Sequence, residues 1–92
     1  MYVCMMEYRI AGEQRTEYLR WAEQMMQSFP GTIIYEGIDQ SGLFVEIWTA
    51  ETAEQAQQIQ DAARSGGAPW NELPKWIGGS KVNAWSFRQL SR

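Results

Sequence analysis

The side chains best able to do chemistry in this chain are aromatic. Tyr8 carries a hydroxyl that can donate to or accept from a phenolic or quinone oxygen, although the simpler interpretation is a core tyrosine with its hydroxyl satisfied or wet. Trp70 and Trp76 lie in a segment that is bracketed by glycine pairs. They could form a lid over a flat apolar ligand; alternatively, they fill the edge of the core or pack against a partner subunit. Arg88 could meet an anionic ligand group. These four residues are the predicted candidates for a small-molecule pocket.

Missing residue types exclude several other chemistries. The 92-residue chain has no His and one Cys. Without His it can supply neither Ser-His-Asp nor Cys-His catalysis, nor an imidazole ligand for a metal or haem. A single cysteine, Cys4, cannot form an internal disulfide or a Cys-based zinc site, and is most simply a small buried hydrophobe. We therefore predict no metal and no cofactor.

The charge balance bears on partners and compartment. Eight Lys and Arg against eleven Asp and Glu give a net charge of −3, and no basic run occurs, which argues against a nucleic-acid surface. The apolar start, residues 1–6, is too short for a signal peptide or a membrane span. We expect a soluble cytoplasmic protein with no membrane partner.

Charged residues also fall inside predicted strands: Glu7, Arg9, Glu36, Glu46 and Arg88. A buried carboxylate among them could have a raised pKa and act as a general base. The alternative, which we favour, is a network of paired charges on neighbouring strands inside a dimer.

The elements that must position these residues follow from the hydrophobic pattern. Strands are predicted at 2–10, 32–38, 43–49 and 81–90, and helices at 13–28 and 52–64. Thr52 followed by Gln55 matches a capping box, and residues 66–80 are irregular with at most one short helical turn. The order βαββαβ predicts one α+β domain over residues 1–92. Its architecture is ferredoxin-like: a four-stranded antiparallel sheet with both helices on one face.

The sheet face without helices should then be partly apolar. Its predicted members are Glu7, Arg9, Phe44, Glu46, Trp48, Trp85 and Phe87, beside Val3, Met5 and Asn83. An apolar face of this kind is costly in water and usually marks an interface. We therefore expect a homodimer with the two sheets packed face to face, and the first seven residues are the interface candidates.

Three short motifs resemble a known family: Met6-Glu7-Tyr8-Arg9-Ile10, Gly12 followed by Glu17-Tyr18, and Glu46-Ile47-Trp48-Thr49-Ala50-Glu51. With the element order, they are similar to the dimeric α/β-barrel group, which includes antibiotic-biosynthesis-type and haem-degrading monooxygenases. The resemblance implies a dimeric α/β barrel with a pocket between sheet and helices.

The catalytic positions of that family are not matched. Tyr8 stands where haem-degrading members have an Asn, Gln57 stands where the second helix has a Trp, and no His exists to ligate iron. The resemblance thus favours a cofactor-independent monooxygenase-like enzyme acting on a small aromatic or quinol compound. The alternative is a non-catalytic small-ligand-binding or stress-associated dimeric module. A third interpretation, a degenerate haem binder, would need Tyr, Cys or Met as the iron ligand.

Overall fold

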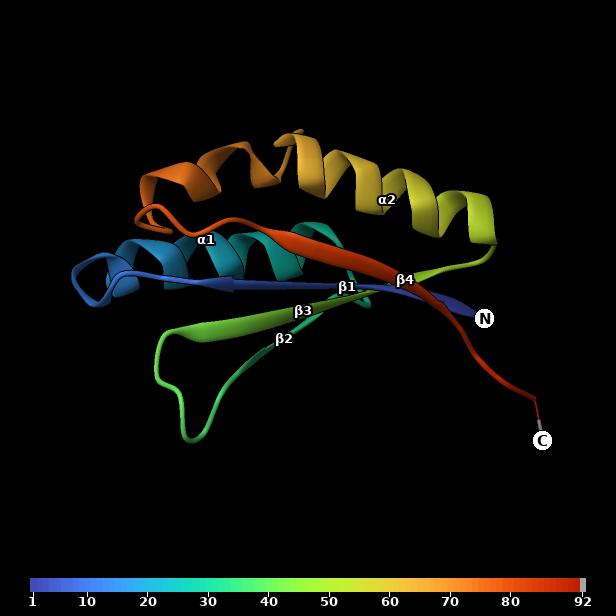
Figure 1. Cartoon of the computed structure of the whole chain (residues 1–92), viewed down its shortest axis with the longest axis horizontal. Coiled ribbons are helices and arrows are strands. Elements are labelled where there is room, and N and C mark those ends of the chain that lie inside the picture. Colours follow the sequence, from blue (N-terminus) through green and yellow to red (C-terminus); the bar gives the residue numbers. More distant parts are fainter. Residues whose placement is uncertain (92) are drawn as a thin grey trace.

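The computed structural model describes residues 1–91, in which two helices cover one side of a four-stranded sheet (Figure 1). The elements are β1 (Tyr2–Arg9), η1 (Gly12–Gln14), α1 (Arg15–Ser28), β2 (Ile33–Glu36), β3 (Leu43–Ala50), α2 (Ala53–Ser65), η2 (Trp70–Lys75) and β4 (Asn83–Arg88). The two η elements are short 3-10 helices. All neighbouring strands are antiparallel in the order β2-β3-β1-β4, which confirms the ferredoxin-like α+β fold.

The ends of α2 show how local sequence sets the element boundaries. The Thr52 hydroxyl accepts from the backbone N–H of Gln55 at 3.1 Å, and the Gln55 side chain accepts from the backbone N–H of Glu51 at 3.0 Å. The Thr52 half of the predicted capping box is therefore confirmed, whereas Gln55 reaches back to Glu51, one residue before the N-cap, instead of to Thr52 itself. Gly66 ends the helix in the left-handed region, with φ of 77°, where a side chain would be strained.

The two helices differ in how closely they approach the sheet. Buried Ala56 and Ala63 let α2 pack tightly on β4 and β1, whereas α1 stands further away on large buried side chains, Tyr18 and Trp21 among them. Trp21 is 9% exposed and belongs to the core. Phe29 is 41% exposed because it lies just beyond the end of α1.

Strand pairing decides which residues face the helices. On β1 the alternate residues Cys4, Met6 and Tyr8 are buried under the helices. Their partners on β3 point the same way, because directly opposed residues in an antiparallel pair share a face. Those partners are Trp48, Glu46 and Phe44, respectively.

The expected open-face position of Phe44, Glu46 and Trp48 is therefore wrong. Their exposures are 3%, 0% and 8%, and they belong to the layer between sheet and helices. Period-two alternation separated the two sides of this strand correctly, but it does not say which side faces the helices. Leu43, Val45 and Ile47 occupy the open face instead.

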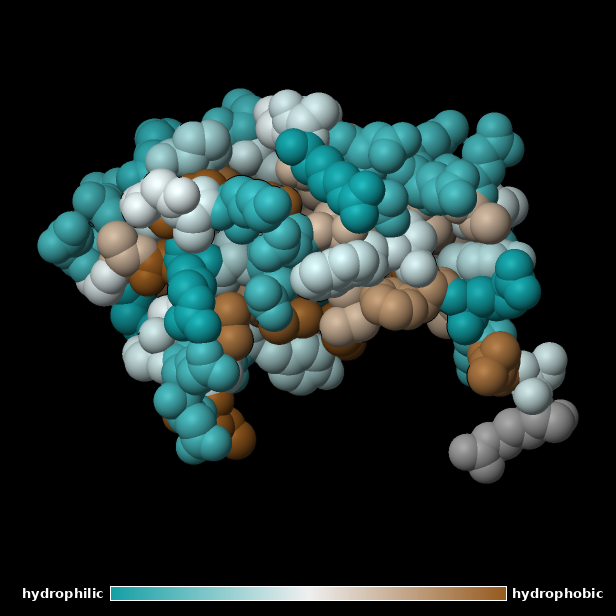
Figure 2. Space-filling view, viewed as in Figure 1, coloured by the Kyte–Doolittle hydropathy of each residue, from teal (hydrophilic) through white to brown (hydrophobic). Residues whose placement is uncertain are grey.

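The other predicted members of the open face do lie there. Glu7, Arg9, Trp85 and Phe87 share the side of the sheet opposite the helices. Figure 2 shows tan and brown atoms gathered along the underside of the strands, between the projecting β2–β3 hairpin and the C-terminal end of the chain. Large side chains remain about half exposed on this face: Ile33, Tyr35, Trp85 and Phe87. Within residues 1–91, neither helix is long and apolar enough to span a membrane.

Candidate functional site

A buried carboxylate, Glu46, organises the layer between sheet and helices. Its Oε1 accepts hydrogen bonds from the indole Nε1 of Trp48 at 2.7 Å and of Trp70 at 3.0 Å. Its Oε2 accepts from the hydroxyl of Tyr8, which lies 2.7 Å from the hydroxyl of Tyr18. These five residues form the Glu46 network, in which each polar side-chain atom has a partner.

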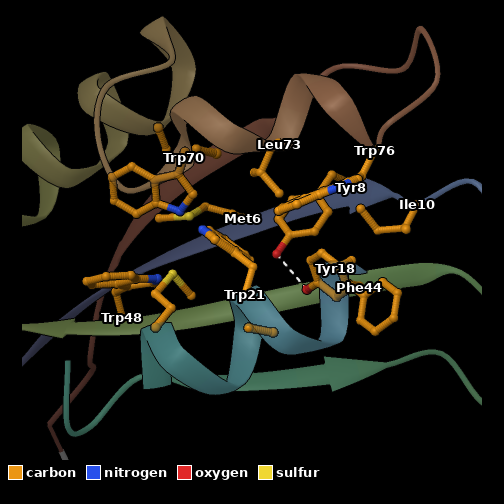
Figure 3. Close-up of a cluster of buried hydrophobic side chains, with 14 of the residues drawn as sticks. Met6, Tyr8, Ile10, Tyr18, Trp21, Phe44, Trp48, Trp70, Leu73 and Trp76 are labelled. Carbon is orange, nitrogen blue, oxygen red and sulfur yellow. Dashed lines mark hydrogen bonds between the residues drawn. The ribbon is translucent and has the colours of Figure 1, made fainter. Parts of the chain in front are cut away.

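Four separate elements deliver the members of the Glu46 network. Tyr8 is on β1, Tyr18 on α1, Glu46 and Trp48 on β3, and Trp70 begins η2. In the pairing of β1 with β3, Tyr8 lies opposite Phe44, two residues before Glu46 on the same face. The Tyr8 hydroxyl therefore reaches the Glu46 carboxylate on the neighbouring strand. Figure 3 shows Trp70 approaching from η2 toward Trp48 on β3, and Tyr8 and Tyr18 meeting at their hydroxyls.

The electrostatics of the network are those of a carboxylate without a cation. The ion pairs found within residues 1–91 are Arg15–Glu36 and Lys75–Glu72, so none involves Glu46. Burial raises the pKa of Glu46, and hydrogen bonds from Tyr8, Trp48 and Trp70 partly oppose that rise. Burial and the neighbouring carboxylate hold the pKa of Tyr8 well above its ordinary value. Tyr8 therefore stays protonated and donates a hydrogen bond to Glu46.

An aromatic groove of about 360 Å³ lies beside this network, between the end of α1 and α2. Phe29, Trp48 and Trp70 supply rings to it, and Ile59, Gln55 and Gln58 line it from α2. The Phe29 and Trp48 ring centroids are 5.0 Å apart at 51°, and those of Trp48 and Trp70 are 5.0 Å apart at 58°. The rings are thus tilted toward one another rather than stacked, and no charged side chain lines the groove.

A second and larger hollow is chemically less informative. It measures about 570 Å³, lies between the end of α2 and β4, and is lined by the cationic residues Arg64 and Lys81 among others. None of the predicted pocket residues borders it. The aromatic groove is the better candidate site, since ligand sites are mostly apolar with a few placed polar groups.

The structure places the four predicted pocket residues in three different settings. Trp70 is 3% exposed and belongs to both the groove and the Glu46 network, while Tyr8 is buried in the network but does not line the groove. Trp76 packs against Tyr18 and donates to the Glu17 carboxylate at 3.3 Å. Arg88 lies beside Tyr2 at the far end of β4, away from the other three. The buried positions of both tryptophans match the core-plug alternative.

Several site residues escaped sequence reasoning. Glu46 and Trp48 were assigned to the wrong face, and Phe29, Gln55 and Gln58 were not singled out as groove residues. A usable signal was present: Glu46 sits between Phe44 and Trp48 at period two, and so occupies an apolar stripe. A carboxylate in such a stripe must find donors, because an unpaired buried charge is very costly.

The remaining candidate chemistry is structural. Glu36 is paired with Arg15, which together with the backbone N–H of Gly42 lowers the pKa of Glu36 to about 2, so Glu36 is no general base at neutral pH. Cys4 is fully buried, and burial raises the pKa of its thiol. In the part of the chain that the structure describes, no cluster of acidic or Cys side chains could hold a metal ion.

No family model matches this chain, and neither a curated protein nor a solved structure is significantly similar to it. The class defined here is therefore the ferredoxin-like fold with an aromatic groove beside a buried carboxylate.

Proposed function

We propose that the chain is a small-molecule-binding protein that takes a small, flat aromatic or quinol compound into the aromatic groove. The groove itself carries this proposal: three rings, an isoleucine and two glutamine amides line an open hollow of about 360 Å³, a volume within the range of small-molecule pockets. Trp48 and Trp70 supply rigid apolar walls. Gln55 and Gln58, one helical turn apart on α2, supply amides for a ligand oxygen.

Binding without turnover is the function the geometry favours. A cofactor-independent oxygenase needs a base that reaches its substrate, and Glu46 is the buried carboxylate nearest the groove walls. Both oxygens of Glu46 are already occupied by Tyr8 and the two indoles, and the residue is 0% exposed. A proton acceptor enclosed in this way stabilises the groove rather than acting on a ligand.

The monooxygenase-like activity of the resembled family is the second candidate. The hydroxyl pair of Tyr8 and Tyr18, joined to Glu46, favours it because such a chain can relay a proton, although neither tyrosine lines the groove. This reaction would consume one O₂ per ligand, place one oxygen atom in the product and release the other as water, with the ligand supplying the electrons. Oxygen uptake with quinols distinguishes it from simple binding.

The homodimer expected from the sequence belongs to the same proposal. Half-exposed Ile33, Tyr35, Trp85 and Phe87 on the open face give two copies a matching apolar surface. Pairing of two sheets through this face would make the dimeric α/β barrel that the sequence resembles.

The binding proposal is tested by thermal shift and calorimetric titration with a panel of phenols and quinols. A native-state ligand must raise the apparent Tm. Ala62→Phe on the groove wall should abolish the shift by filling the groove, whereas Gln57→Phe, on an exposed part of α2 outside the groove, should leave it. A shift that survives Ala62→Phe, or no shift with any compound, would contradict the proposal.

A further inference from the structure

The surface area of the chain is larger than a folded monomer of this mass ordinarily exposes. Its accessible surface is 6185 Å², for a mass of 10.6 kDa. The size scaling of monomeric proteins gives about 5,500 Å² at that mass, so roughly 700 Å² is in excess. Each partner of a standard protein–protein interface buries about 800 Å². The excess therefore matches the area that one copy would bury in a stable dimer.

The composition of the open face suits a second copy of the same chain. Of the strand residues on this face, Glu7 and Arg9 carry opposite charges two positions apart on β1, so two facing copies bring no net charge together. All four strands contribute apolar side chains around them, among them Met5, Ile33, Tyr35, Val45, Ile47 and Trp85. An apolar centre with a few charged groups is the usual composition of an interface.

The turn of the β2–β3 hairpin projects from the sheet toward this open side, away from the helices (Figure 1). Ile38 in this turn is 99% exposed, and Figure 2 shows brown atoms at the end of the projection. Two packed sheets stand about 10 Å apart. A segment that projects from one sheet toward the other must therefore lie alongside the strands of the second copy. A face-to-face dimer would bring the hairpin turn into contact with that copy.

Polar contacts hold the hairpin turn in place. The Glu36 carboxylate accepts from the backbone N–H of Gly42 at 3.1 Å and is ion-paired with Arg15 of α1. The Gln40 side chain accepts from the Arg9 guanidinium of β1 at 2.6 Å. Because the turn is tied in this way to α1 and β1, it loses little conformational entropy on association. The exposed isoleucine is thus presented on a preorganised support.

We propose that the β2–β3 turn is an arm by which each copy of the chain holds the other, with Ile38 buried against the second copy. This inference rests on the proposed dimer and adds a contact beyond the flat face of the sheet. The two-fold symmetry of such a dimer provides two equivalent arms, so that a substitution in the turn acts twice.

Ile38→Ser tests the arm through the Kd of the dimer, measured by sedimentation velocity over a dilution series. Loss of two apolar contacts per dimer should raise the Kd by about 10- to 100-fold, with unchanged far-ultraviolet circular dichroism. Met26→Gln, at a residue 37% exposed on α1, is the matched control and should leave the Kd as it is. An unchanged Kd for Ile38→Ser would overturn the arm and leave the sheet-face dimer standing, whereas a monomeric wild type would overturn both.

A dye at the same position tests the contact itself. Ile38→Cys supplies one accessible thiol, because the natural Cys4 is fully buried. A trace of this variant, labelled with an environment-sensitive dye, is titrated with unlabelled wild-type chain, and its emission should shift to the blue as dimers form. The same titration with Trp85→Glu as the unlabelled chain should give no shift. An emission that does not respond to a dimeric wild type would overturn the burial of Ile38.

Discussion

At the scale of single residues, Glu46 is the most consequential side chain of this protein. A carboxylate that receives two indole N–H groups and one phenol, and no cation, is held entirely by hydrogen bonds. The sequence pattern predicted that Glu46 would lie on the open face, in a dimer interface. The structure instead buries it in the layer between the sheet and the helices. The difference arises because β-strand alternation fixes two sides without saying which is buried.

The burial of Glu46 predicts an unusual pH dependence of stability. Its pKa in the folded chain lies above its ordinary value of 4.5. As the pH rises past 4.5, the unfolded chain loses this proton while the folded chain retains it, so ionisation favours unfolding until the folded pKa is passed. The free energy of unfolding of the wild type, relative to Glu46→Gln, should therefore fall with rising pH. Urea unfolding of both proteins from pH 4 to 8 measures this difference, and a flat or rising difference would refute it.

Tyr8 should contribute to stability through its hydroxyl alone. Tyr8→Phe keeps the ring, which is 2% exposed, but leaves Glu46 Oε2 and the Tyr18 hydroxyl without their shared partner. Removing one partner of a buried polar pair costs about 1–3 kcal/mol. Tyr35→Phe, on the open face at 54% exposure, is the matched control and should change the free energy of unfolding by less than about 0.5 kcal/mol. Equal effects of the two substitutions would contradict the network.

At the scale of elements, the order and number of strands and helices could be predicted from the sequence. Each has a clear hydrophobic periodicity and ends at residues that break a helix or strand. The boundaries of these strands and helices shifted by at most two residues, as the 32–38 strand shows by shortening to Ile33–Glu36. The segment 66–80 was less predictable. Its single helical turn became η2, Trp70–Lys75, whose place over the core depends on contacts of Trp70, Leu73 and Trp76 with distant elements, which local patterning cannot supply.

The start of α2 offers a test of the elements that hold the groove. Thr52→Ala removes the acceptor for the Gln55 N–H and should cost about 1 kcal/mol. Because Gln55 also lines the groove, loosening this turn should weaken phenol binding as well. Ser65→Ala, at the opposite end of the helix, removes only an exposed bond to the Ala62 carbonyl and serves as the control. The account fails here if both substitutions have the same effect on binding.

At the scale of the whole molecule, both the sequence and the structure describe a sheet with one covered face and one apolar open face. The expectation that this face would include Trp48 fails, since Trp48 contributes to the core and the groove. A substitution at Trp48 therefore tests folding and the proposed ligand binding. The proposed association is tested by substitutions on the open face.

Trp85 is the open-face residue best suited to testing the proposed dimer. It is 44% exposed on β4, so Trp85→Glu should leave the fold intact while placing a charge in an apolar interface. Light scattering should give a dimeric mass for the wild type and a monomeric mass for the variant, with unchanged far-ultraviolet circular dichroism. A monomeric wild type, or a variant that stays dimeric, would contradict pairing through this face.

The aromatic groove as a small-molecule site is tested most directly by the indole N–H signals in ¹H–¹⁵N NMR spectra. The chain has five Trp residues, of which Trp48 and Trp70 line the groove, while Trp85 lies on the opposite face of the sheet. Titration with the phenols and quinols of the binding panel should shift the Trp48 and Trp70 signals in a saturable way and leave that of Trp85 in place. Shifts confined to Trp85, or no saturable shift at Trp48 and Trp70 with any compound, would contradict the account.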